Sequence, residues 1–214
     1  MVDELELLKK DWQKKGEHLP KLSYDEIYKM IWKKSSSIVK WIFYISIIEF
    51  VFWAGINIIF SDPNSMQELK AMHIYNVMMV LNIVNYGVIL YFIFSFYKNY
   101  RKISFTDSSK KLMGAILKVK KTVTHYVWFN LIIFTITMLI SIYGVLVYGP
   151  EGKKIIESAL QDVNEITFWI MVSIISIVFI AVLLLLIWLF YKLLYGILLK
   201  KLKENYNDLK KLEV

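Results

Sequence analysis

Five strongly polar side chains lie well inside stretches of sequence that are mostly apolar. They are one carboxylic acid and four amides: Glu49, Asn57, Asn82, Asn85 and Asn130. A charge at the centre of a membrane helix costs about 2.5–3.5 kcal/mol, so such a residue normally faces other helices and has a partner. We expect Glu49 to be a neutral acid that hydrogen-bonds to Asn82 or Asn85 and holds the helices together. The alternative is a proton or ligand site centred on Glu49, Asn82 and Asn85.

The rest of the sequence offers no catalytic chemistry. It contains no cysteine, which excludes thiolate nucleophiles, disulfides and zinc–thiolate sites. The three histidines, His18, His73 and His125, fall in different regions of the chain, so a shared metal site is not expected. The common phosphate-loop, dinucleotide, zinc-protease and serine-hydrolase motifs do not occur. We therefore expect no catalytic residues, no cofactor and no bound metal.

The elements that carry these polar residues are long and apolar. Each exceeds the roughly 18 residues that indicate a membrane span, and together they are 38–60, 72–97, 126–148 and 167–190. The 57% hydrophobic content agrees with this interpretation, as does the mean hydropathy of +0.48. The sequence predicts an all-α fold, an integral membrane four-helix bundle in the lipid bilayer.

Basic residues are distributed unequally between the two ends of these stretches. Of the 26 Lys and Arg residues, 23 fall in the N-terminal segment, the middle loop 98–125 and the C-terminal tail. The positive-inside rule therefore predicts that both termini and the middle loop are cytoplasmic. We divide the chain into N-terminal cytoplasmic helices at 1–37, a membrane domain at 38–190 and a C-terminal cytoplasmic helix at 191–214. The +8 net charge is expected to serve topology and contact with anionic lipid, without direct nucleic acid binding.

The helices are expected to continue beyond the membrane. Ser23 and Glu26 have the spacing of a capping box that starts a helix running into the first span, and Ser108 or Asp107 can cap the helix that runs into the third. Two apolar stripes follow from helical spacing: Leu112, Ile116, Val119 and Val123, and in the tail Tyr195, Leu198, Leu202, Asn205, Leu209 and Leu212. We expect these extensions to pack on one another within one subunit. A coiled-coil homodimer, or a larger membrane complex, is the alternative.

Residues near the membrane boundary are expected to face the headgroups. The run Ser35, Ser36 and Ser37 lies among lysines and is interpreted as polar filler at that depth, with modification or lipid phosphate binding as the alternatives. Tyr126 and Tyr191 belong to the aromatic belt at the cytoplasmic ends of their spans.

The N-terminal segment contains apolar residues with no obvious place in the bundle. A short helix carrying Leu5, Leu8 and Trp12 is followed by a Gly16–Pro20 joint, and Ile27 and Ile31 lie on the next helix. Helices this short are marginal in water, so they need a surface on which to pack. We expect these five residues to anchor a soluble cytoplasmic protein partner.

Three segments also suggest a family: LELLKKDW at 5–12, EIYKMIWKKSSSIVKW at 26–41 and ISIIEF at 45–50. They resemble uncharacterised polytopic inner-membrane proteins of flavobacteria and related Bacteroidota. The resemblance implies a bacterial inner membrane location and an anti-sigma-like role, with a sigma factor as the partner. The leading functional prediction is thus a non-enzymatic membrane-anchored regulatory protein. The alternatives are a small transporter or proton-coupled protein centred on Glu49, and a structural subunit of an envelope complex.

Overall fold

A computed structural model describes residues 6, 9, 23–59, 63–104 and 108–213. Within these residues the chain is helical and contains no strand, which confirms the all-α class. The short helix with Leu5, Leu8 and Trp12, and the joint after it, lie outside the described residues.

Seven α-helices and one short π-helix make up the described chain. Their bounds are α2 Tyr24–Ile59, α3 Pro63–Ala71, α4 Tyr75–Ser104, α5 Ser109–Tyr148, α6 Pro150–Asp162, α7 Glu165–Tyr191, a π-helix Lys192–Gly196 and α8 Ile197–Leu212. Four helical stretches are long and apolar enough to cross a membrane, and each overlaps one of the four predicted spans, although α4 begins three residues after the predicted start at 72. The last of them is the continuous rod formed by α7, the π-helix and α8.

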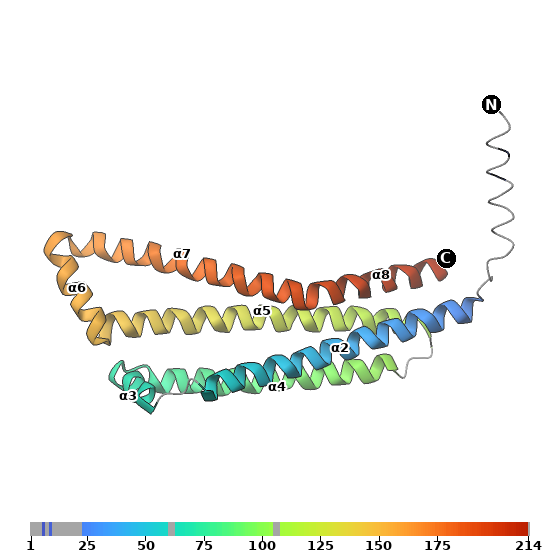
Figure 1. The fold of residues 1–214 in the computed structure, drawn as a ribbon, viewed down its shortest axis with the longest axis horizontal. Helices are drawn as coiled ribbons and strands as arrows, with labels where there is room; N and C mark the ends of the chain where they lie inside the picture. The colour runs from blue at the N-terminus through green and yellow to red at the C-terminus, as the bar shows by residue number, and fades with distance from the viewer. Residues whose placement is uncertain (1–5, 7–8, 10–22, 60–62, 105–107, 214) are drawn as a thin grey trace.

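The long helices lie roughly side by side, with α3 and α6 at one end (Figure 1). Helix α5 is central, because it contacts α4, α7 and α8, while α2 contacts α4 and α8. The start of α2, the end of α4, the start of α5 and the whole of α8 meet at the opposite end, which we call the basic end. The end with α3 and α6 is called the apolar end.

The helix starts follow the predicted capping chemistry. The backbone N–H of Ser23 donates to Glu26 Oε2 at 2.8 Å, and the backbone N–H of Glu26 donates to Ser23 Oγ at 3.3 Å, which completes the capping box of α2. The hydrogen bonds from the backbone and side chain of Ser23 hold the pKa of Glu26 below its usual range. Ser108 caps α5 by accepting a hydrogen bond from the backbone N–H of Lys111.

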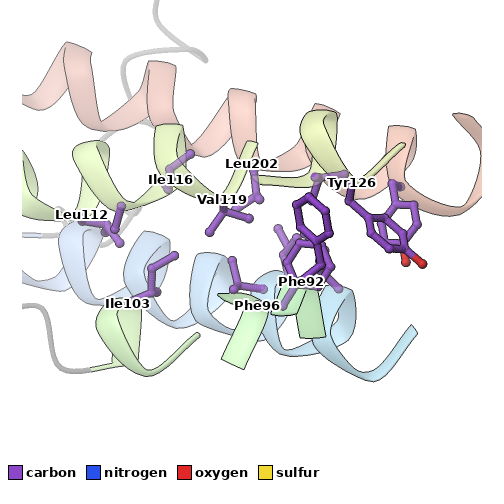
Figure 2. Packing of buried hydrophobic residues seen from close by; sticks show 14 of the residues in the cluster. Phe92, Phe96, Ile103, Leu112, Ile116, Val119, Tyr126 and Leu202 are labelled. Atoms are coloured by element: carbon purple, nitrogen blue, oxygen red, sulfur yellow. The ribbon is translucent and has the colours of Figure 1, made fainter. Parts of the chain in front are cut away.

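The closely packed core lies toward the basic end. Figure 2 shows Phe92, Phe96 and Tyr126 at one end of this cluster, with Ile103 and Leu112 toward the other. The two predicted apolar stripes enter it: Leu112, Ile116, Val119, Val123, Tyr195, Leu202 and Leu209 are buried, and Leu198 and Leu212 pack against it. The extensions therefore pack on one another within one chain, as predicted.

Two predictions about residues at the membrane boundary are wrong, because these residues lie in the buried core. Ser35 is fully buried, and its hydroxyl accepts a hydrogen bond of 2.9 Å from Asn205 of α8, so it is not headgroup filler. Tyr126 and Tyr191 are also buried and face the inside of the bundle. Trp41, Tyr97, Trp128 and Trp188 remain exposed at this level, as expected of residues in an aromatic belt.

The apolar end is packed more sparsely. Helix α7 presents isoleucine and valine side chains on most of its surface there, and Phe168 and Ile180 are its buried residues in this half. One close contact fixes α4 on α5: a Cβ added at Gly144 would lie 2.7 Å from Ile74 Cδ1. His73, just before α4, adopts a φ of 56°, in the left-handed region.

Candidate functional site

Glu49 is buried on α2 and bonded at both carboxyl oxygens. The hydroxyl of Tyr191 donates to Oε1 at 2.7 Å, and the hydroxyl of Tyr195 donates to Oε2 at 2.9 Å. Glu49 itself is 6% exposed. The predicted hydrogen bond to Asn82 or Asn85 is wrong, because the donors to Glu49 are the two tyrosines, while Asn82 donates to the backbone carbonyl of Met78.

The two tyrosines reach Glu49 from the point at which the last rod changes from an α-helix to a π-helix. Tyr191 ends α7 and Tyr195 lies within the π-helix, a rare element that often marks functional sites. Their rings stack with centroids 6.1 Å apart, and the ring of Tyr126 meets both edge-on at 6.0 Å. This aromatic support fixes the hydroxyls, so the carboxyl group is held in one orientation.

Sequence analysis missed both tyrosines as partners of Glu49. Glu49 lies at the middle of the first apolar stretch, whereas Tyr191 and Tyr195 follow the end of the fourth. The first span is therefore displaced toward the basic end relative to the fourth. One sequence signal could have identified these partners: two tyrosines four residues apart at the end of a span, because residues at that spacing share a helix face.

A cavity of about 550 Å³ opens beside Glu49, between α2, α4, α5 and α7. The polar residues predicted from the sequence all line it: Glu49, Asn57, Asn82, Asn85 and Asn130. The structure thus brings these five residues together around one cavity, although the amides do not bond to Glu49.

The amides present mainly acceptors to this cavity. Asn57, Asn82 and Asn130 each donate one Nδ2–H to a backbone carbonyl four residues earlier, at 2.8–3.0 Å. The Oδ1 of Asn85 is buried and has no hydrogen-bond donor among the described residues, whereas Asn57 and Asn82 are more exposed. Polar atoms left unpaired in an apolar environment are costly, so the cavity favours an occupant that donates hydrogen bonds.

The walls of the cavity are apolar and aromatic. They include Phe50, Trp53, Tyr86, Phe134 and Phe190, and the lining residues contain no Lys, Arg or His. A carboxyl group, amide oxygens and aromatic faces together are suited to a cation with an apolar body. Within the described chain no three His, Cys, Asp or Glu side chains come close enough to hold a metal ion.

The structure separates the predicted partner anchors from this site. Ile31 is buried in the core at the basic end and Ile27 packs against that core, so neither side chain is free to anchor a separate protein. Leu5, Leu8 and Trp12 lie outside the described residues.

Comparison with known proteins gives a family and no further relative. No curated protein and no solved structure matches the chain. A family model described as "Domain of unknown function" matches residues 25–214, which include all four apolar helices and the Glu49 cavity. The chain therefore belongs to the family DUF8845.

Proposed function

We propose that this protein is a non-enzymatic membrane protein that binds a small amphipathic ligand in the cavity beside Glu49. The observation that carries this proposal is that five polar side chains, from three different helices, line one cavity within otherwise apolar stretches. Polar side chains at such depth usually mark a ligand or ion pathway. Of the functions considered from the sequence, the one centred on Glu49 is the best supported.

The ligand we propose has a cationic, hydrogen-bond-donating head and an apolar body. A carboxylate can accept about four hydrogen bonds, and Glu49 accepts one at each oxygen from the tyrosines, which leaves acceptor capacity for an ammonium group. The oxygens of Asn82, Asn85 and Asn130 supply further acceptors around the same cavity. The aromatic walls suit both an alkyl body and a cation–π contact.

Binding of a dansyl-labelled primary alkylamine to the purified full chain in detergent tests this proposal. The expected result is saturable binding that Glu49→Gln weakens by roughly tenfold or more, since Gln keeps the shape but not the charge. The matching alcohol and the matching carboxylic acid should bind more weakly than the amine. Glu26→Gln is the matched control, because Glu26 is exposed and far from the cavity in its helix, and it should leave binding unchanged.

Equal affinity for the amine, the alcohol and the acid would contradict the proposed ligand class. Equal binding of the amine by the wild type and Glu49→Gln would contradict the role of the carboxylate. The second result is interpretable only if Glu49→Gln elutes as the wild type does on size exclusion.

We also propose that the four apolar helices span the bacterial inner membrane with both termini in the cytoplasm. The basic end carries most of the lysines, and helices α2 and α8 both have their polar extensions there. Single cysteines at Ser158 of α6 and at Ser108 provide a test, because the native chain has no cysteine. An impermeant thiol reagent added to intact cells should label the first and not the second, and the reverse pattern would invert the topology.

A regulatory role through a cytoplasmic protein is a second candidate. It is favoured by the layer at the basic end in which α2, α5 and α8 pack together beyond their apolar stretches. Since Ile27 and Ile31 are used in that packing, a partner such as a sigma factor would depend on the segment with Leu5, Leu8 and Trp12. Deleting residues 1–20 should abolish recovery of a soluble partner while the bundle remains inserted, and an unchanged set of co-purifying proteins would refute this role.

A further inference from the structure

A second concave site lies toward the basic end and is lined by α2 at positions before Glu49. It is a groove of about 750 Å³ between α2 and the rod formed by α7, the π-helix and α8. Its lining contains no residue of the Glu49 cavity, so the two sites are separate.

The groove has a charged rim and an apolar floor. Lys33 and Lys34 of α2 and Lys201 of α8 line the end that points away from the apolar stretches. The lysines gather at this end because they lie on the parts of α2 and α8 outside the apolar stretches. Helix α2 begins before the first stretch, and α8 follows the fourth. Ile45 and Leu193 therefore line the inner end, with Ile45 inside the first apolar stretch and Leu193 three residues after the fourth.

The three rim lysines have no carboxylate partner within the described residues. Beside them lie the hydroxyl group of Ser37 and the exposed indole of Trp41, which is 57% exposed. Unpaired ammonium groups, a hydroxyl donor and an amphipathic ring beside an apolar groove match the phosphate and the first part of an acyl chain.

We propose that this groove binds one anionic phospholipid of the cytoplasmic leaflet. Lys33, Lys34 and Lys201 hold the phosphate, and the acyl chain lies along Ile45 and Leu193. A second copy of the chain fits less well, because a symmetric contact would bring the unpaired lysines of both copies together. A zwitterionic lipid gains less, since its own cation opposes the lysines.

Native mass spectrometry of the full chain in detergent, titrated with phosphatidylglycerol or phosphatidylcholine, tests this site. A basic residue near an anionic lipid contributes a factor of about five in affinity, so Lys33→Gln, Lys34→Gln and Lys201→Gln together should weaken phosphatidylglycerol binding roughly 100-fold. Phosphatidylcholine binding should be weak in the wild type and unchanged in this variant.

The matched control removes the same charge elsewhere at the basic end. Lys110, Lys120 and Lys121 are exposed on α5 and do not line the groove, so changing all three to Gln should lower phosphatidylglycerol affinity less than fivefold. Equal losses in the two triple variants would mean diffuse attraction and overturn the site. No loss in the groove variant would overturn it as well, and circular dichroism of both variants verifies that they are folded.

Discussion

Removing the Tyr191 hydroxyl should cost more stability when Glu49 is a charged carboxylate, as the proposed ligand requires, than when a neutral group stands at this position. The hydroxyl donates to Glu49 Oε1 at 2.7 Å, and both residues are 6% exposed, so water cannot replace the lost donor. A hydrogen bond to a charged group contributes about 1.5–3 kcal/mol and one between neutral groups about 0.5–1.5 kcal/mol. Tyr191→Phe should therefore cost about 1.5–3 kcal/mol in the wild type and about 1 kcal/mol less in a Glu49→Gln background.

Reversible unfolding in mixed detergent micelles measures this double-mutant cycle. Tyr86→Phe is the matched control, because Tyr86 lines the same cavity and packs edge-on against Phe50 without a hydroxyl partner among the described residues. It should change stability by less than about 0.5 kcal/mol. Equal costs of Tyr191→Phe in the two backgrounds would mean that the carboxyl group of Glu49 is neutral in the wild type, as the sequence analysis predicts, and would refute a charged Glu49.

Three further predictions concern the packing around the bundle and use the same unfolding assay. Asn205→Ala should cost about 1–3 kcal/mol, because it leaves the buried Ser35 hydroxyl without its partner, and an unchanged midpoint would contradict this. Gly144→Val should cost about 1–3 kcal/mol through its clash with Ile74, and Ile74→Ala should relieve most of that cost if the clash is the cause. His73→Val should cost about 1–2 kcal/mol, because a β-branched residue is strained at a φ of 56°; a stability equal to the wild type would exclude this strain.

The fold class and the helix starts could be predicted from local patterns. The lengths of the apolar stretches were enough to predict the four long helices. The Ser23–Glu26 spacing predicted a capping box, which forms as expected. The burial of Leu202 and Leu209 followed from their spacing, because a helical stripe needs a surface on which to pack. Each of these predictions depends on residues within a few turns of one another.

The partners of Glu49 depended on the register between two distant helices and could not be predicted in this way. Sequence alone aligns the spans by their centres, which sets Glu49 level with Asn82 and Asn85. In the structure Glu49 does line one cavity with Asn82 and Asn85, but it also lies level with Tyr191 and Tyr195, at the end of the fourth stretch. The burial of Ser35 was missed for the same reason, since its donor, Asn205, is 170 positions away along the chain.

Photo-cross-linking tests the ligand-binding proposal most directly. A primary alkylamine that carries a diazirine in its chain would be bound to the full protein and irradiated. Mass spectrometry would then identify the residues that carry adducts. The proposal predicts adducts on the cavity walls at Phe50, Trp53 and Phe134, and their loss in Glu49→Gln. Adducts confined to the exposed face of α7, at residues such as Ile174 and Ile175, and unchanged in Glu49→Gln would contradict it.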